Sequence, residues 1–202
     1  MIEYNKAIDN RFRIDSKKFN RINLPSRKEL IHVHYSNRGH IEYTNSQIAI
    51  RLDNVYKGES KLEYGKEDID PNIYPNLDKL FSNKPLNSVK LNIKPIEDVL
   101  EPFIKEKIKT VDVEITNKFI KFIFLDNNHL QNNSICHLDI KTDIYEPFKF
   151  TINPQYLYYG LRFFRLLKIY ELELFYNHKH SPIFLTHENL EMIIMRIRNK
   201  EV

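Results

Sequence analysis

Positively charged side chains gather in two short segments of the sequence. The first segment, residues 11–21, carries five cations and one carboxylate. These cations are Arg11, Arg13, Lys17, Lys18 and Arg21. The second segment, between residues 155 and 168, carries Arg162, Arg165 and Lys168 and no carboxylate. Lysine and arginine on one helix face can neutralise phosphate groups without reading bases, but the same pattern suits an ordinary solvated face. Both interpretations stay open at this point.

A third group of cations is balanced by its neighbours. Lys105, Lys107 and Lys109 close a predicted helix, and four carboxylates between residues 97 and 106 offset their charge fully. The whole chain has a formal net charge of +4. This mild excess of positive charge does not by itself indicate nucleic-acid binding.

The histidines and the single cysteine are the candidate metal ligands. His32 and His34 share one face of a predicted strand, and His178 and His180 lie two residues apart in a predicted turn. Tight metal sites need three or four ligands with ordered neighbours, so we expect no metal. Cys136 has no activating base nearby in the sequence and is expected to be structural.

No pattern of residues indicates catalysis. The motifs G-x-S-x-G, H-E-x-x-H, G-x-G-x-x-G and G-x-x-x-x-G-K-[ST] are absent from the sequence. Asp112 and Glu114 fall on the exposed side of an alternating strand, where charge is expected. We therefore predict that the protein is not an enzyme and needs no cofactor.

The composition is that of a globular protein, with 202 residues of which 42% are hydrophobic and 29% charged. This length suits one large or two small domains. Apolar runs are too short to span a membrane, and residues 1–13 lack the apolar core of a secretory signal. A lone cysteine excludes a disulfide framework, and together these features favour the cytoplasm.

The elements that must position these residues repeat along the chain. A unit of strand, helix and three strands is predicted near residues 11–52, 88–140 and 148–197. In the last unit, a strand at 148–152 leads to Asn153 and Pro154, a favourable helix start. The fold class expected from this pattern is α+β.

The first two units are less regular. The middle helix contains Pro102, which should kink or delay it. The first unit is predicted as a strand at residues 12–14, a short basic helix at 17–22 and three strands ending at Leu52. Residues 55–87 are predicted to be a connector, with a short turn of structure at 77–81.

The C-terminal residues resemble a known family. The segments that carry the resemblance are 152–157 (INPQYL), 172–174 (LEL), 181–183 (SPI) and 193–197 (IIMRI). They are similar to the closing half-domain of the bacterial DNA polymerase sliding clamp, the beta subunit. Weaker similarity extends to 74–77 (YPNL) and 41–48 (IEYTNSQI).

The resemblance has departures. Ile194 stands where the family has proline, residues 48–50 replace Gly-His-Arg, and five residues follow the usual end of the family. The chain is also much shorter than a three-domain clamp. We therefore expect a reduced clamp, with a shortened N-terminal domain and connector at 1–86 and a C-terminal clamp domain at 87–202. A phage or mobile element is a plausible origin.

The resemblance implies a DNA clamp-like architecture with sheets outside and helices lining one face. Duplex DNA would then lie against the helices without sequence preference. The implied DNA-binding residues are Arg11, Arg13, Lys17, Lys18, Arg21, Lys105, Lys109, Arg162, Arg165 and Lys168.

The resemblance also implies a pocket for a polymerase peptide. The implied pocket residues are Ser46, Gln47, Leu80, Phe81, Ile194, Met195 and Arg196. The competing interpretation is that Ile193, Met195 and Ile197 simply form one buried face of a last strand.

The function implied is that of a processivity factor that tethers a replicative polymerase to DNA. The implied partners are duplex DNA, a polymerase and other clamp-binding peptides, and a clamp loader. Rings of this family contain twelve such units, which a homo-oligomeric ring would supply with four chains of three units, or with three chains if residues 55–87 hold a fourth unit. The alternative is a clamp-fold decoy or regulator of replication that never encircles DNA.

Overall fold

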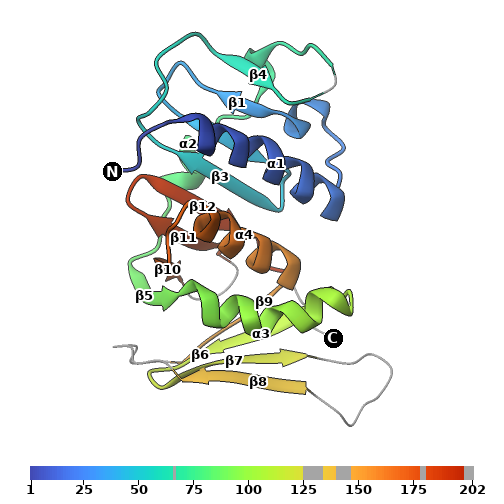
Figure 1. Cartoon of the computed structure of the whole chain (residues 1–202), viewed down its shortest axis with the longest axis vertical. Helices are drawn as coiled ribbons and strands as arrows, with labels where there is room; N and C mark the ends of the chain where they lie inside the picture. The colour runs from blue at the N-terminus through green and yellow to red at the C-terminus, as the bar shows by residue number, and fades with distance from the viewer. Residues whose placement is uncertain (66, 125–133, 140–146, 178–180, 198–202) are drawn as a thin grey trace.

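A computed structural model describes residues 1–65, 67–124, 134–139, 147–177 and 181–197 of the chain (Figure 1). Its helices are α1 (Lys6–Ile22), α2 (Asp78–Phe81), α3 (Ile93–Lys105) and α4 (Pro154–Leu166), with short 3-10 turns η1 (Lys28–Ile31) and η2 (Pro71–Ile73). Its strands are β1 (Val33–Tyr35), β2 (Ile41–Thr44), β3 (Ile48–Leu52), β4 (Lys61–Glu63), β5 (Asn87–Asn92), β6 (Val111–Ile115), β7 (Phe119–Phe124), β8 (Ser134–Asp139), β9 (Phe148–Ile152), β10 (Glu171–Tyr176), β11 (Ile183–His187) and β12 (Leu190–Ile194). None of the described helices is long and apolar enough to cross a membrane.

The strands form two antiparallel sheets. The larger has eight strands in the order β4-β1-β2-β3-β12-β11-β10-β5, and the smaller has four in the order β8-β7-β6-β9. The larger sheet joins segments from the two ends of the chain, because β3 pairs with β12 with Ile50 opposite Met192. The junction between β3 and β12 therefore creates one continuous surface from distant parts of the sequence.

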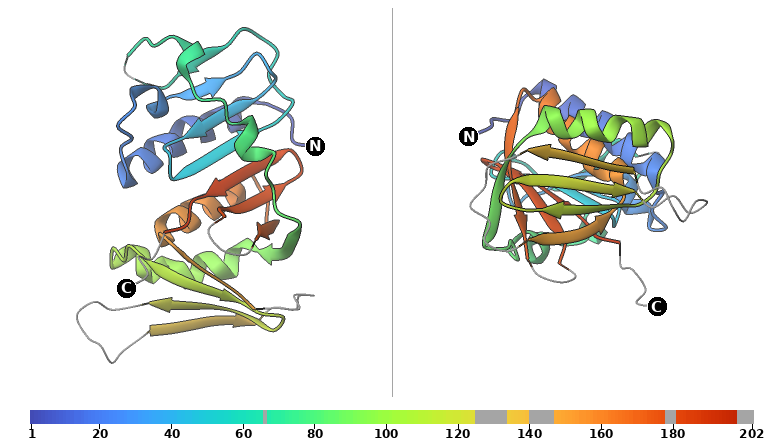
Figure 2. Two further views of the ribbon diagram at one scale, coloured as in Figure 1. Left: turned by 180° about the vertical axis from the view of Figure 1, so that it is seen from behind. Right: turned by 90° about the horizontal axis from the view of Figure 1, so that it is seen from below.

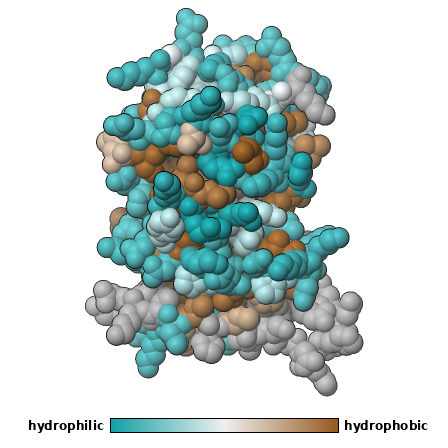
Figure 3. All heavy atoms as spheres, in the orientation of Figure 1, coloured by the Kyte–Doolittle hydropathy of each residue, from teal (hydrophilic) through white to brown (hydrophobic). Residues whose placement is uncertain are grey.

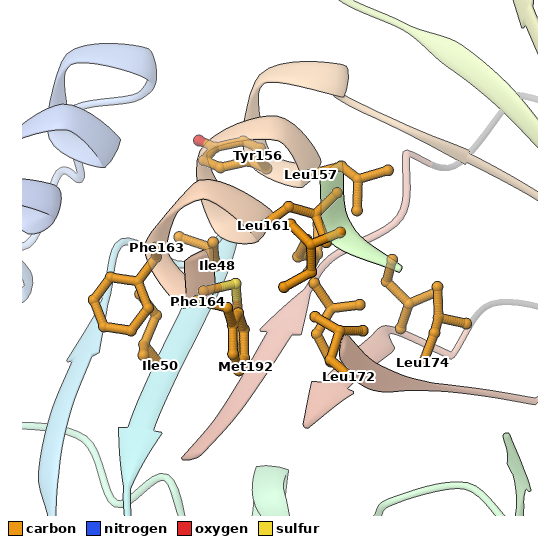
Figure 4. Close-up of a cluster of buried hydrophobic side chains, with 14 of the residues drawn as sticks. Ile48, Ile50, Tyr156, Leu157, Leu161, Phe163, Phe164, Leu172, Leu174 and Met192 are labelled. Atoms are coloured by element: carbon orange, nitrogen blue, oxygen red, sulfur yellow. The ribbon is translucent and has the colours of Figure 1, made fainter. Parts of the chain in front are cut away.

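The helices form a layer on one side of the sheets. Figure 1 shows α1, α4 and α3 on the same face, with α4 between the other two, and Figure 2 shows the sheets from behind. Figure 4 shows Phe163 and Phe164 of α4 packed near Ile50 and Met192 of the sheet. All four are fully buried, and each such side chain stabilises the fold by about 1.5–3 kcal/mol relative to exposure.

One predicted element is wrong. The segment 12–14 is not a strand, because α1 begins at Lys6 and runs straight through it. The side chain of Asn5 caps this helix by accepting hydrogen bonds from two backbone N–H groups of its first turn. Phe12 and Phe19, seven residues apart, are buried on the same helix face. Three alternating residues are too few to distinguish a strand from this stripe.

The other predicted elements agree with the structure in outline. The second and third units have the predicted order of strand, helix and three strands, and α3 continues through Pro102 to Lys105. The first unit has its three strands, although the segment from Leu30 begins as the turn η1. His178 and His180, which are predicted to lie in a turn, fall outside the described residues.

The connector is more structured than the sequence indicates. It contributes β4, η2 and α2, and it crosses the sheet face opposite the helix layer (Figure 2). A second apolar cluster lies beneath it. The buried members of this cluster are Leu30, Ala49, Tyr74, Leu77, Phe81, Phe184 and Ile193. The connector therefore covers the junction between β3 and β12 on the outer face of the sheet.

Candidate nucleic-acid interface and apolar groove

The exposed face of α1 carries a line of cations. Arg13, Lys17 and Arg21 are exposed at four-residue spacing, so their side chains lie along one side of the helix. Among the described residues, no carboxylate forms an ion pair with any of these three side chains. Figure 3, which looks onto the helix layer, shows a largely hydrophilic surface. This line can make contacts with successive phosphates of a duplex.

The other two cations of α1 are partly neutralised. Asp15 is buried, and its two carboxylate oxygens lie 3.3 Å from Arg11 Nε and 2.8 Å from Lys18 Nζ. Both pairs join residues on successive turns of the same helix. Asp15 therefore neutralises part of the charge of Arg11 and Lys18, and these ion pairs stabilise α1.

The cations of α4 are held by neighbouring side chains. Arg165 forms an ion pair with the buried carboxylate of Glu97 on α3, which ties the two helices together. Arg162 is half-buried, and its guanidinium lies 3.4 Å from the hydroxyl of Tyr158. Lys168 is exposed just beyond the helix, at a left-handed backbone position with φ of 64°. Only part of the predicted basic face of α4 is therefore free for a ligand.

The surface of α3 is close to neutral. Lys105 lies 3.2 Å from Glu101, and Lys94 pairs with Asp98 one turn away. Lys109 is exposed after the end of the helix. The free positive charge of the helix layer is therefore concentrated on α1.

A groove of about 270 Å³ lies on the opposite face of the large sheet, where β3 meets β12 beneath the connector. Its lining is mostly apolar. The lining residues are Arg27, Leu30, Thr44, Ser46, Ile48, Ala49, Pro75, Leu77, Leu80, Ile193 and Met195.

Strand alternation decides which side chains reach the groove. Ile193 and Met195 project to the outer face, whereas Ile194 between them is buried in the core beneath the helices. Ile193 lies opposite Ala49 in the register of β12 and β3. Met195 is 37% exposed, so it offers a mobile apolar surface at the groove mouth.

Comparison with known proteins gives matches at the level of structure. No family model matches the sequence, and no curated protein matches it. The Helicobacter pylori beta clamp bound to a DNA ligase peptide has a TM-score of 0.70 at 12% identity and covers 93% of this chain. The DNA polymerase III subunit beta of Pseudomonas aeruginosa has a TM-score of 0.74 at 11% identity and covers 98%. The chain has the beta-clamp fold.

The match spans only part of these neighbours. The chain covers 63% of the length of the Helicobacter pylori clamp and 67% of that from Pseudomonas aeruginosa. The α+β class and the resemblance to the clamp are confirmed at the level of the fold, with antiparallel sheets and a helix layer as expected.

The predicted pocket residues divide into two sets within this clamp fold. Ser46, Leu80 and Met195 line the groove. Phe81 and Ile194 are buried beside it, in the connector cluster and the main core respectively. The other two, Gln47 and Arg196, do not line it either. The backbone oxygen of Gln47 accepts a hydrogen bond from the backbone N–H of Met195, 2.9 Å away, and so joins the two groove segments.

Arg196 lies against a different part of the clamp fold. Its guanidinium stacks over the rings of Phe148 and Phe150, at 4.6 and 5.5 Å from their centroids. It also donates to the backbone oxygen of Asn177, 3.0 Å away. Burial lowers the pKa of Arg196 to about 10, so the side chain stays charged at neutral pH. These contacts hold the chain after β12 against β9 and the end of β10.

Several groove residues escape sequence reasoning. Ile193 shares the outward face with Met195 and could be found from strand alternation alone. Leu30 and Leu77 could not, because they reach the groove only when η1 and the connector fold over the sheet. Thr44 lies two residues before Ser46, on the same side of the β2–β3 turn. No local pattern marks it as a lining residue.

A buried amide fixes the β2–β3 turn at the groove. The side-chain oxygen of Asn45 accepts from the backbone N–H groups of Gln47 and Ile48, both at 3.1 Å. Its nitrogen donates to the backbone oxygen of Phe19 in α1, 3.0 Å away. Ser46 adopts a left-handed backbone with φ of 73° at the tip of this turn. The groove wall is therefore attached directly to the helix layer.

The two histidines predicted to share a strand face lie in the interior of the protein. His32 and His34 are both buried, but they make separate contacts. His32 Nε2 lies 2.9 Å from the backbone oxygen of Glu67, and His34 Nδ1 lies 3.4 Å from Glu42 Oε2. His40, Glu42 and Asp78 lie close enough together to suggest a metal site.

Two guanidinium groups already occupy this acidic cluster. Arg51 pairs with both Glu42 and Asp78, and Arg38 pairs with Asp78. The positive charge of two arginines disfavours a cation there. We interpret this cluster as an ion-pair network rather than as a metal centre.

Proposed function

We propose that the protein is a DNA sliding clamp-like processivity factor. It binds duplex DNA without sequence preference and tethers a replicative polymerase through the groove. The observation that carries this proposal is the placement of the two surfaces. The cation line of α1 and the apolar groove lie on opposite faces of one continuous sheet. DNA and a partner can therefore be held at the same time, which makes rebinding of the partner effectively intramolecular.

The chemistry of the helix layer suits sliding. Arg13, Lys17 and Arg21 are exposed cations along one side of α1. Such groups bind phosphates through charge and allow the protein to move along the duplex. Arg162 on α4, Lys168 just after α4 and Lys109 after α3 add further positive charge outside α1.

The chemistry of the groove suits a short peptide with apolar anchors. Leu77, Leu80, Ile193 and Met195 provide its apolar surface, and Arg27 is the one charged side chain among its lining residues. A structural neighbour, the Helicobacter pylori beta clamp, has been solved with a DNA ligase peptide bound. We propose that the groove of this chain takes a polymerase segment of the same general kind.

Encircling DNA requires several copies of the chain. We propose a homo-oligomeric ring of three or four chains, loaded by a clamp loader, acting in the cytoplasm of a host cell or on behalf of a phage. Within each chain, residues 1–86 form the shortened domain with its connector and residues 87–202 form the C-terminal domain. The role is a non-catalytic one.

A second candidate is a clamp-fold decoy or regulator that never encircles DNA. The charge balance of α3 and the pairing of Arg165 with Glu97 favour this candidate, because they leave little free positive charge on two of the three long helices. Such a protein would keep the groove but bind duplex DNA weakly.

Two titrations separate these candidates. Fluorescence anisotropy with two unrelated duplexes, across a range of salt concentrations, should give equal affinities that fall steeply with salt. Calorimetry with the DNA ligase peptide should give binding at the groove. Peptide binding without DNA binding would favour the decoy or regulator. Absence of both would overturn the proposal.

A further inference from the structure

The connector is anchored to the sheet by ionic and aromatic contacts. We use the name strap for its residues 74–84, which run across the outer face from β1 to β11. At one end the ring centroids of Tyr74 and His34 lie 4.5 Å apart. At the other end Lys84 lies 4.2 Å from the ring centre of Phe175 and 3.4 Å from the carboxylate of Glu191. The strap is therefore fixed at both ends.

A row of polar side chains crosses the sheet beneath the strap. The strand registers place His34 opposite Glu42, Glu42 opposite Arg51, and Arg51 opposite Glu191. Glu42 and Arg51 are buried and form an ion pair. The ring of Phe81 from the strap packs 4.4 Å from the guanidinium carbon of Arg51. The strap thus shields a charged pair that would otherwise face water.

Asp78 is the point where the strap meets this row. One of its carboxylate oxygens accepts from Arg51 at 2.8 Å, and the other pairs with Arg38 from the β1–β2 turn. His40 Nε2 lies 3.7 Å from the same carboxylate. Asn76 accepts from the backbone N–H of Asp78 at 2.8 Å and from Arg38 at 2.7 Å. Three groups, one from β3 and two from the β1–β2 turn, therefore converge on one residue of the strap.

The neighbours of Asp78 in the chain are groove residues. Leu77 precedes it and Leu80 lies two residues after it, and both line the groove. The backbone N–H of Leu80 donates to the oxygen of Leu77 at 2.9 Å and so joins the two leucines through the single turn α2. A helix of one turn has little stability of its own. Its position must come from contacts with the sheet.

We propose that Asp78 is the positioning residue of the groove: its pairs with Arg51 and Arg38 hold α2 so that Leu77 and Leu80 form the wall opposite Ile193 and Met195. This inference rests on the proposed function of the groove. Asp78 does not itself line the groove. It acts on a bound peptide only through the two leucines.

The structure also explains why this role can be separated from folding. Arg51 keeps Glu42 as its partner when Asp78 is removed, so no buried charge is left uncompensated. Asp78 itself is 42% exposed. The variant Asp78→Ala should therefore fold, with the strap loosened locally.

Hydrogen exchange tests the positioning without any ligand. The amides of Leu80, Phe81 and Ser82 are hydrogen-bonded within α2 in the wild type. In Asp78→Ala they should exchange about tenfold faster, while amides of α4 exchange at the wild-type rate. Arg38→Ala, which removes the other partner from an exposed turn, should act in the same direction. Unchanged exchange in both variants would overturn the inference.

A double-mutant cycle tests the effect on binding. Asp78→Ala should weaken the peptide affinity measured in the titration above by about tenfold, and its effect should be clearly smaller in a Leu80→Ala background, where only Leu77 remains to be positioned. The matched control is Asp98→Ala on α3, which removes a carboxylate of similar exposure far from the groove. Additive losses from Asp78→Ala and Leu80→Ala would overturn the inference. If the wild type binds no peptide, the proposed function fails while the exchange experiment still decides the role of Asp78.

Discussion

At the scale of single residues, adjacent positions near the end of β12 have different roles. Met195 lines the groove, whereas Arg196 stacks on Phe148 and Phe150. Met195→Ala should lower peptide affinity by about tenfold or more, because truncating a groove anchor removes apolar contact. The same variant should unfold at the wild-type denaturant concentration. Calorimetry and chemical denaturation measure the two effects.

Arg196→Ala is the matched comparison and should behave in the opposite way. Loss of two cation–π contacts and one hydrogen bond should lower the free energy of unfolding by about 1–3 kcal/mol. Peptide affinity should stay within about twofold of the wild type, since the side chain does not touch the groove. Lost peptide binding with unchanged stability would place Arg196 in the binding site after all.

Asp9 gives a residue-scale prediction about pH. Burial tends to raise the pKa of Asp9, but hydrogen bonds from the hydroxyls of Tyr35, Tyr64 and Tyr4 outweigh it and lower the pKa below its usual value. A carboxylate with a lowered pKa stabilises the fold above its unfolded pKa near 3.9, and this contribution is lost as the pH falls through the folded pKa.

Denaturation at a series of pH values checks this expectation. The wild type should lose stability on acidification below about pH 5, and Asp9→Asn should remove part of that loss while lowering stability at pH 7. The exposed Glu3, close in sequence, is the control for loss of a carboxylate, and Glu3→Gln should leave the stability at pH 7 unchanged. Identical acid profiles for wild type and Asp9→Asn would contradict the role assigned to Asp9.

At the scale of elements, α1 should provide most of the DNA contact. Replacing Arg13, Lys17 and Arg21 together with glutamine should weaken duplex binding equally on unrelated sequences. The slope of log affinity against log salt should become shallower by about one unit for each lost phosphate contact. Anisotropy titrations at several salt concentrations measure this slope.

A change on α3 controls for the loss of a cation that is already paired. Lys94 is paired with Asp98, so Lys94→Gln should leave both the affinity and the salt slope nearly unchanged. If the triple variant of α1 bound as tightly as the wild type at every salt concentration, the DNA-binding role of α1 would be lost.

At the scale of the whole molecule, an edge strand lies at each end of the long axis, β4 at one end and β8 at the other (Figure 1). The terminal strands β8 and β4 have six and three residues. Exposed edges favour pairing with another chain, and head-to-tail pairing of identical chains closes most readily as a ring. Each chain supplies three long helices, α1, α3 and α4. Four chains would then give a layer of twelve helices around the hole.

Light scattering across a concentration series should give a mass of three or four times 24.4 kDa. The mass should reach a plateau, because a closed ring stops growing whereas an open chain of subunits does not. A mass that stays at 24.4 kDa at high concentration would favour the decoy or regulator. A mass that rises without limit would indicate filaments.

The sequence by itself determined most of the elements and their order. Alternation in β6 and β9, the Asn153–Pro154 start of α4 and the apolar spacing along α3 are local signals, because each reports which side of one element faces the core. These signals give three repeated units and the α+β class. The local signals give a wrong prediction at residues 12–14. Three alternating residues there suggest a strand, whereas the helix start that includes them is marked by Asn5, seven residues earlier.

Only the tertiary structure decided where the groove forms and which cations are left without an ion pair among the described residues. The groove exists because β3 pairs with β12, nearly 140 residues further along the chain, and because the strap folds over that junction. The charge of Arg165 is cancelled by Glu97 on a different helix, which no spacing along the chain reveals. Periodicity fixes which way a side chain faces within its own element. Which distant side chains it then meets depends on packing between elements, and that is where the candidate sites are formed.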